Sequence, residues 1–102
     1  NPSAAPLADL LPLRVRLAPA AAVLDTPCLV GDHIEIRRAL THPALDRPVA
    51  FLGGSELAPL LDRLPTAPSL AAAIGSWDRA LPSGRALDIA AWLRRRGLLD
   101  IA

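Results

Sequence analysis

The spacing of apolar residues changes at Gly53, and this change decides which elements the chain can form. Before Gly53, apolar and polar residues alternate in short runs, which is the period of a strand with one buried face. After Gly53, apolar residues recur at helical spacing in segments that prolines and glycines separate. Strands followed by helices predict an α+β domain, in which a small sheet packs on helices.

Three runs carry the strand pattern. In "LRVRL" (residues 13–17), apolar residues alternate with basic ones. In "CLVGDHIEIRRAL", we expect Val30, Ile34 and Ile36 to face inward and His33, Glu35 and Arg37 to face outward, although the spacing of Asp32 and Glu35 would also suit a helix capping box. "PVAFL" (residues 48–52) is wholly apolar and predicts a strand covered on both faces. The second and third strands are expected to form a hairpin across the loop "THPALDR".

Two short helical segments follow these strands. Ser55 is expected to cap "ELAPLLDRL", in which Pro59 is tolerated only in the first turn. Ser69 is expected to cap "LAAAI", and Gly75 to end it. A surface loop carrying Trp77 would then lead to the last helix, with the indole packed over the end of the helices.

The last helix is expected over residues 84–96, with Ser83 as its cap and Gly97 at its end, and "LLDI" should continue as a short extended piece. Together these elements predict a winged-helix-like fold, in which a small antiparallel three-stranded sheet packs on three helices. Residues 1–12 are predicted to be an N-terminal tail or linker, with one helical turn before Pro12. Residues 13–102 form the predicted domain.

Composition limits the core and the partners. A chain of 102 residues fits one domain. The chain is 52% hydrophobic, yet Phe51, Trp77 and Trp92 are its only aromatic residues, so its core must be built mainly from aliphatic side chains. Eleven basic residues face ten acidic ones, a net charge of +1. Because a nucleic-acid binder usually carries a strong positive excess, nucleic acid is not the expected partner.

Cysteine content and hydropathy bear on the compartment. Cys28 is single, so no disulfide can form within the chain. We find no apolar run long enough to span a membrane and no signal-peptide pattern. The chain is therefore expected to be soluble and cytoplasmic, without a membrane partner. Its bias towards Ala, Leu, Arg and Pro is typical of GC-rich bacterial genomes.

No residue pattern predicts catalysis or metal binding. Cys28, His33 and His42 match no common zinc spacing. Nothing marks Ser55 or Ser83 as an activated nucleophile beyond its suitability as a helix cap. The sequence therefore predicts no catalytic site, no metal and no cofactor, and favours a binding role.

The last helix is apolar around most of its circumference. Only Arg85, Asp88 and Arg95 define a polar side. Either the chain itself covers the remaining apolar surface, or the helix forms one wall of a groove beside residues 48–52, where an extended peptide could add to the sheet. The arginines at 94–96 suit both interpretations, because cations are favoured at a helix C-terminus and guanidinium groups also bind carboxylates.

Three stretches carry a resemblance to a known family: "LRVRLAP", "VAFLGGSELAPLLDRLPTAPSLAAAIG" and "DIAAWLRRRGLL". They resemble the precursor-peptide recognition domains of ribosomally made, modified peptide (RiPP) pathways, typified by the peptide chaperone family of pyrroloquinoline quinone biosynthesis. The resemblance implies that a leader peptide docks as an extra strand between the third strand and the third helix and is presented to a modifying enzyme. At matching positions, the implied peptide-binding residues are Val49, Ala50, Phe51 and Leu52 on the strand, and Leu87, Ala91, Trp92 and Arg95 on the helix.

Two other functions stay open at this point. The first is a winged-helix DNA-binding domain of a transcription factor, with residues 84–96 as recognition helix and the arginines at 94–96 on phosphates, which predicts strongly salt-dependent binding. The second is a C-terminal winged domain of a larger enzyme, resembling the closing domain of cupin-type protein hydroxylases.

Overall fold

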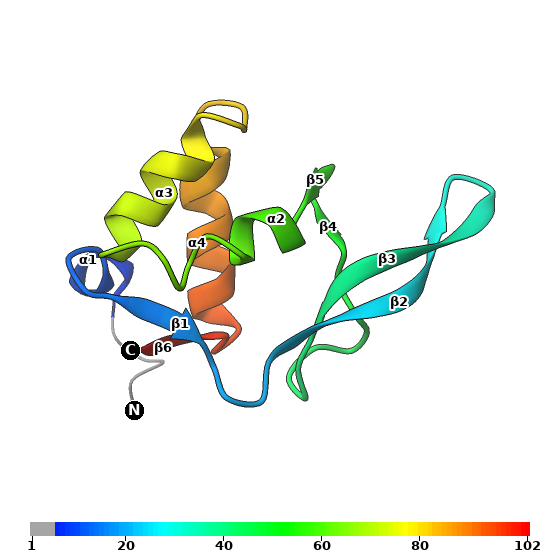
Figure 1. Cartoon of the computed structure of the whole chain (residues 1–102), viewed down its shortest axis with the longest axis horizontal. Coiled ribbons are helices and arrows are strands. Elements are labelled where there is room, and N and C mark those ends of the chain that lie inside the picture. The colour runs from blue at the N-terminus through cyan, green and yellow to red at the C-terminus, as the bar shows by residue number, and fades with distance from the viewer. Residues whose placement is uncertain (1–5) are drawn as a thin grey trace.

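The computed structural model describes residues 6–102, which form a helical body and a projecting two-stranded ribbon (Figure 1). The α+β class is confirmed. The molecule measures 41 × 29 × 20 Å, and the ribbon extends it along its longest axis. In chain order the elements are α1 (Leu7–Leu10), β1 (Val15–Leu17), β2 (Ala22–Val30), β3 (His33–Thr41), β4 (Phe51–Leu52), β5 (Ser55–Glu56), α2 (Ala58–Leu61), α3 (Leu70–Asp78), α4 (Arg85–Arg95) and β6 (Leu99–Ile101).

The strands of residues 6–102 pair in three separate two-stranded antiparallel sheets, β1–β6, β2–β3 and β4–β5, in place of one three-stranded sheet. Val49 makes an isolated bridge to Leu40, in which both backbone N–H groups donate to the opposite carbonyl at 2.9 Å. The segment that was expected to form the third strand therefore joins β3 at one point.

The ribbon pairs β2 with β3 from Ala22↔Thr41 to Val30↔His33. Gly31 begins its tight turn with φ of 63°, a conformation that glycine adopts without strain. The hairpin predicted between the second strand and residues 48–52 is reduced to the single bridge at Val49, and the full-length partner of β3 is β2. Pro27 obscured β2 in the sequence, but proline is tolerated in an edge strand because one side of the strand needs no donor.

A second, very short hairpin joins β4 to β5 through Gly53 and Gly54, which have φ of 58° and 84°. Positive φ at both loop residues is the requirement of a type I′ turn. Ser55 lies in β5, so the prediction that it caps a helix was wrong. Pro59 does lie in the first turn of α2, as expected.

Helix α3 extends beyond its predicted end. Ser69 caps it as expected, since its Oγ accepts the Ala72 N–H at 3.1 Å. The helix runs through Gly75 to Asp78, which places Trp77 on the helix and not in a loop. The indole is fully buried, and its Nε1 donates to the Leu60 carbonyl at 2.9 Å. Burial of this large ring against α2 outweighs the poor helix propensity of glycine.

Helix α4 begins after Gly84, which has φ of 81°, so the predicted cap at Ser83 was wrong. Its C-terminal end matches the prediction. Gly97 has φ of 72°, its N–H donates to the Arg94 carbonyl at 3.0 Å, and the Leu98 N–H donates to the Leu93 carbonyl at 2.9 Å. This pair of bonds is the Schellman motif.

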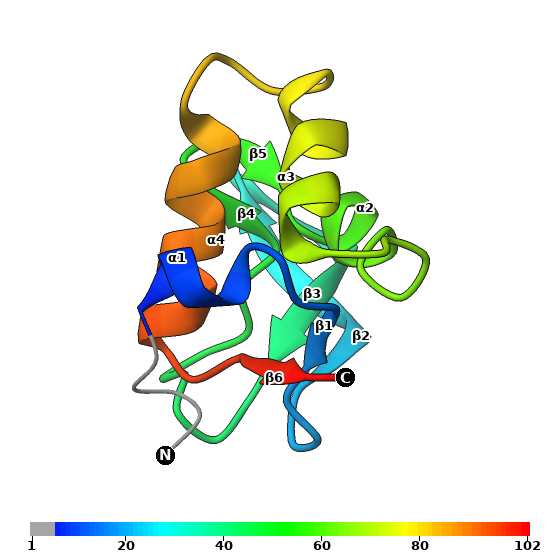
Figure 2. The same cartoon turned by 90° about the vertical axis from the view of Figure 1, so that its left-hand side faces the viewer.

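The core lies between α2, α3, α4 and the β1–β6 sheet (Figure 2). Helix α1 belongs to it, because Leu10 is buried and the Leu11 carbonyl accepts the Ala71 N–H at 2.9 Å. The predicted tail therefore packs on the body from Leu7 onward, and residues 1–5 lie outside the described chain. The largest fully buried side chains are Trp77, Leu40, Leu57, Leu64, Leu70, Ile89, Leu93 and Leu98.

Candidate functional site

Helix α4 buries one face and leaves another partly open. Ala86, Ile89, Ala90 and Leu93 face the core. Of the expected helix wall, Leu87 is 49% exposed, Arg95 is exposed, and Ala91 and Trp92 are half-buried. Apolar surface of α4 thus remains outside the core.

Part of the backbone of the expected strand wall is already hydrogen-bonded, although the backbone groups of Phe51 face away from β5. Besides the bridge at Val49, the Ala50 carbonyl accepts the Leu57 N–H at 3.0 Å. Phe51 and Leu52 pair with β5. Among the described residues, β2 pairs only with β3, so its other edge is a free strand edge over its whole length.

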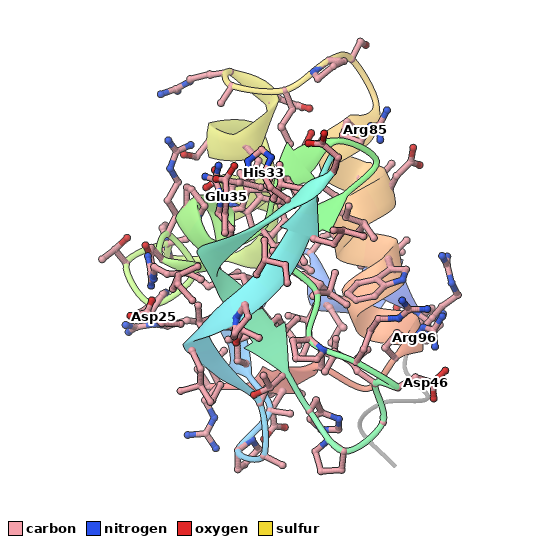
Figure 3. The ribbon with its side chains drawn as sticks, turned by 90° about the vertical axis from the view of Figure 1, so that its right-hand side faces the viewer. Asp25, His33, Glu35, Asp46, Arg85 and Arg96 are labelled. Atoms are coloured by element: carbon pink, nitrogen blue, oxygen red, sulfur yellow. The ribbon has the colours of Figure 1, made fainter. Side chains whose placement is uncertain are left out.

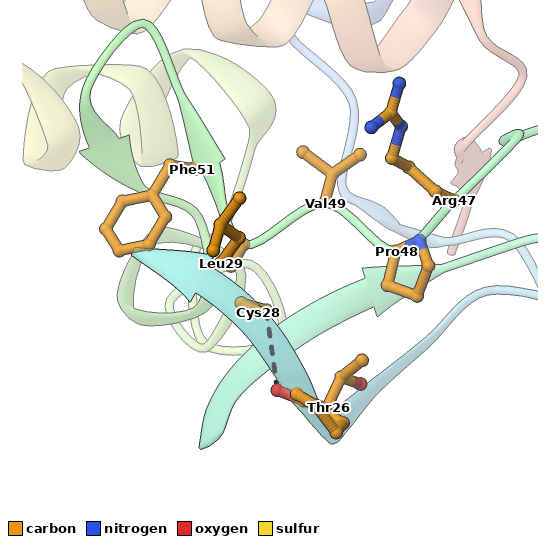
Figure 4. A pocket seen from close by; sticks show the side chains of 9 residues that line it. Thr26, Cys28, Leu29, Arg47, Pro48, Val49 and Phe51 are labelled. Carbon is orange, nitrogen blue, oxygen red and sulfur yellow. Dashed lines mark hydrogen bonds between the residues drawn. The ribbon is translucent and has the colours of Figure 1, made fainter. Parts of the chain in front are cut away.

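A pocket of ≈ 460 Å³ lies between residues 26–29 of β2 and residues 47–51 (Figure 4). Pro27, Leu29, Val49 and Phe51 give it an apolar lining. The Phe51 ring also lies under the Arg37 guanidinium, at 5.8 Å from its centroid. Within residues 6–102, positions 47 and 48 make no backbone hydrogen bond. An apolar pocket therefore lies beside irregular backbone with free hydrogen-bonding groups.

A second pocket of ≈ 170 Å³ lies on the other side of the same segment. Leu45, Asp46, Arg47 and Val49 line it from the segment, and Trp92 and Arg96 from the end of α4. The Arg96 guanidinium lies over the Trp92 ring, 5.7 Å from its centroid. Because Arg47 and Val49 line both pockets, the two adjoin along residues 45–51. We call the two pockets together the groove.

The groove contains part of the expected site. Val49, Ala50 and Phe51 line the first pocket, and Val49 and Trp92 line the second. The structure does not bring Leu52, Leu87, Ala91 and Arg95 into either pocket. Sequence reasoning missed residues 26–29 and Arg47, whereas Arg96 is one of the arginines at 94–96 that were expected to suit carboxylate binding. The signal available for β2 was that Thr26, Cys28 and Val30 occupy every second position, as in a strand. Pro27 lies within this pattern and argues against a strand.

The distal part of the ribbon carries an exposed apolar face. Leu29, Ile34 and Ile36 are 76%, 71% and 64% exposed. Leu29 lies directly opposite Ile34, and Pro27 opposite Ile36, so the four side chains share one face. The predicted orientation of this strand was therefore wrong. Isoleucines at 34 and 36 point to solvent, while Glu35 and Arg37 are half-buried.

Ion pairs explain this reversed orientation. The Arg37 guanidinium contacts Glu35 at 2.6 Å and Glu56 of β5 at 3.4 Å. His33 Nε2 also contacts the Glu35 carboxylate at 2.6 Å (Figure 3). Hydrogen bonds from His33, and then from Arg37, lower the pKa of Glu35. These contacts hold the polar face of the ribbon against the β4–β5 hairpin.

A second ion pair joins the ribbon to the body. Both terminal nitrogens of Arg38 donate to the Asp62 carboxylate, at 2.8 and 2.9 Å. This bidentate hydrogen bond lowers the pKa of Asp62 and raises the pKa of Arg38. Since Asp62 directly follows α2, the pair sets the position of β3 relative to the helices.

The candidate metal ligands make other contacts. Cys28 Sγ lies 3.4 Å from the Thr26 carbonyl, and His42 Nδ1 accepts the Ala44 N–H at 2.9 Å. Across residues 6–102, no three His, Cys, Asp or Glu side chains gather as a metal site would require. In the same part of the chain, no helix has the length and apolarity to cross a membrane.

Comparison with known proteins gives no relative: no family model, no curated protein and no solved structure matches the chain. A function must therefore be argued from the groove and from the free edge beside it.

Proposed function

We propose that this chain is a non-catalytic binding domain that captures an extended precursor peptide by strand addition and presents it to a modifying enzyme. One observation carries the proposal: the ≈ 460 Å³ apolar pocket lies beside the unpaired edge of β2. Strand addition needs both features, because the edge supplies main-chain hydrogen bonds and a pocket selects side chains.

The order of elements supports the same function. From β2 onward the chain forms two long strands, a short strand pair and three helices (Figure 1). The resemblance to precursor-peptide recognition domains implies three strands followed by three helices, so the chain from β2 onward has this order with one additional strand before the helices. In this proposal the fold is winged-helix-like, and the β2–β3 ribbon is its wing.

Pro27 limits how a peptide can pair with β2. Antiparallel pairs alternate in hydrogen bonding, and the pair that flanks the turn, Val30↔His33, fixes the alternation. Leu29 and Pro27 then direct their backbone groups to the free edge, where Leu29 offers an N–H and a carbonyl but Pro27 offers a carbonyl alone. The ladder to a peptide is therefore incomplete, so side chains in the pocket must supply much of the affinity. The missing donor also protects the edge from unwanted strand pairing.

The direct test is a titration of isotope-labelled protein with short synthetic peptides selected on it from a random library. We expect the amide signals of residues 26–29 and 47–51 to shift on binding, prolines excepted. Leu29→Gln should weaken binding about tenfold, since it removes apolar contact in the pocket. Leu29 is 76% exposed, so the change should leave the fold intact.

Leu24→Gln is the matched control, because Leu24 is 54% exposed on the same strand but does not line the pocket. It should bind like the unmodified chain. Shifts confined to the far side of the body, or equal losses in both variants, would overturn the proposal.

A further inference from the structure

We infer that the captured peptide carries an acidic side chain next to its apolar segment, and that this carboxylate binds between Arg47 and Arg96 in the second pocket. The inference rests on the proposed peptide capture and names the chemistry of the ligand. Its basis is the positive charge of the second pocket, where the groove meets α4, which a carboxylate would complement.

Two guanidinium groups meet at this end from different elements. Arg47 belongs to the segment before β4, and Arg96 directly follows α4. Neither has a carboxylate within ion-pair distance in residues 6–102, whereas Arg37 and Arg38 are both paired. Asp46 lines the same pocket and lies near Arg96 in Figure 3, so the pocket holds two cations and one anion. One further carboxylate would balance this charge.

Capping of the helix does not account for Arg96. Three of the last four carbonyls of α4, on Trp92, Leu93 and Arg94, accept backbone N–H groups from Arg96, Leu98 and Gly97. They need no guanidinium donor. The Arg96 guanidinium instead lies over the Trp92 ring, which orients it at the edge of the pocket. An oriented guanidinium is well suited to bidentate binding of a carboxylate.

The two pockets can accept one continuous peptide. Arg47 and Val49 line both pockets, so only the segment of residues 45–51 lies between them, and a peptide that crosses this segment would enter both. In an extended peptide, side chains on one face recur about every 6.5 to 7 Å. An aliphatic side chain in the first pocket therefore leaves a nearby acidic side chain within reach of the second. The expected ligand is an extended peptide in which aliphatic and acidic residues alternate.

The test compares two synthetic peptides, one alternating Leu and Val with Glu, the other with Gln in place of every Glu. Fluorescence anisotropy should show about tenfold tighter binding of the Glu peptide at low salt, and a smaller difference at high salt. Arg47→Gln and Arg96→Gln should each reduce this preference about threefold. Arg79→Gln is the matched control, since it removes the same charge from an exposed residue at the end of α3.

The outcomes separate this inference from the proposed function. Equal binding of both peptides, with amide shifts at residues 26–29, would overturn the acidic preference and leave peptide capture standing. Binding of neither peptide would overturn both. If Arg79→Gln reduced the preference as much as the pocket variants do, net charge alone would attract the Glu peptide. If Arg47 and Arg96 bound duplex DNA and not the Glu peptide, the site would be assigned to phosphates. Either result contradicts the inference.

Discussion

The two tryptophans of the chain occupy opposite environments. Trp77 is fully buried and donates to the Leu60 carbonyl, while Trp92 is half-buried at the groove. Trp77→Phe should lower the free energy of unfolding by roughly 2 kcal/mol, because it removes the indole hydrogen bond to the Leu60 carbonyl, which keeps only the Arg63 N–H, and creates a small cavity. Trp92→Phe should cost much less. Urea unfolding of both variants measures the difference, and similar losses would contradict this view of the core.

The Arg38–Asp62 pair should make stability depend on pH. The pKa of Asp62 is lowered from its ordinary value of 3.8, so the folded state favours the ionised carboxylate. A lowered native pKa contributes stability above the unfolded value, and this contribution is lost as pH falls through the native value. Arg38→Gln and Asp62→Asn should therefore each destabilise the protein at neutral pH.

A double-mutant cycle with these two variants isolates the pair from other acid effects. The coupling free energy, measured by urea unfolding, should favour the pair at neutral pH and vanish at pH values well below 3.8. A coupling that persists in acid would show that the carboxylate charge is not its source.

At the scale of elements, one glycine inside α3 and one glycine just after α4 have opposite roles. Gly97 has φ of 72° in the Schellman motif, and an L side chain is strained there. Gly75 lies inside α3 without positive φ, and an added Cβ would meet nothing within 4 Å. Gly97→Ala should therefore destabilise the protein by about 1 kcal/mol, whereas Gly75→Ala should stabilise it by about 0.5 to 1 kcal/mol. Thermal unfolding distinguishes the signs, and a loss in both variants would contradict the assignment.

Elements that depend on local signals could be predicted from the sequence. The cap at Ser69, the end of α4 at Gly97 and the strand nature of β1 and β6 follow from a few neighbouring residues. The orientation of β3 could not be predicted, because the pair that holds its Arg37 face against the body is made with Glu56, which is distant in sequence. The end of α3 was missed for the same reason, since Trp77 is buried by contacts with α2.

The candidate site shows the same division. Its strand wall at Val49, Ala50 and Phe51 was expected from an apolar run. The contributions of β2 and of Arg96 arise only once the ribbon and α4 lie on either side of residues 45–51. A pattern within one segment carries no information about which other segment will face it.

At the scale of the whole molecule, the chain divides into a packed body and a thinly supported ribbon (Figure 1). The fully buried side chains belong to the body and to the base of β3. Between Ala39 and the turn at Gly31, two ion pairs tie the ribbon to the body, Arg37–Glu56 and Arg38–Asp62. Surface ion pairs contribute little stability, and a two-stranded ribbon whose apolar face is open to solvent is marginal in water.

Hydrogen exchange should therefore divide the molecule in the same way. Amides in the distal ribbon, residues 26–37, should exchange through local opening at least about tenfold faster than interior amides of α4, which require unfolding of the body. A bound peptide should slow exchange in the β2 part of the ribbon by pairing with its free edge and filling the adjoining pocket. Exchange followed by mass spectrometry, with and without a peptide selected on the protein, measures both effects. Ribbon amides that exchange as slowly as those of α4 in the free protein would show that the ribbon needs no partner to be stable, and the exposed face at Leu29, Ile34 and Ile36 would then need a different explanation.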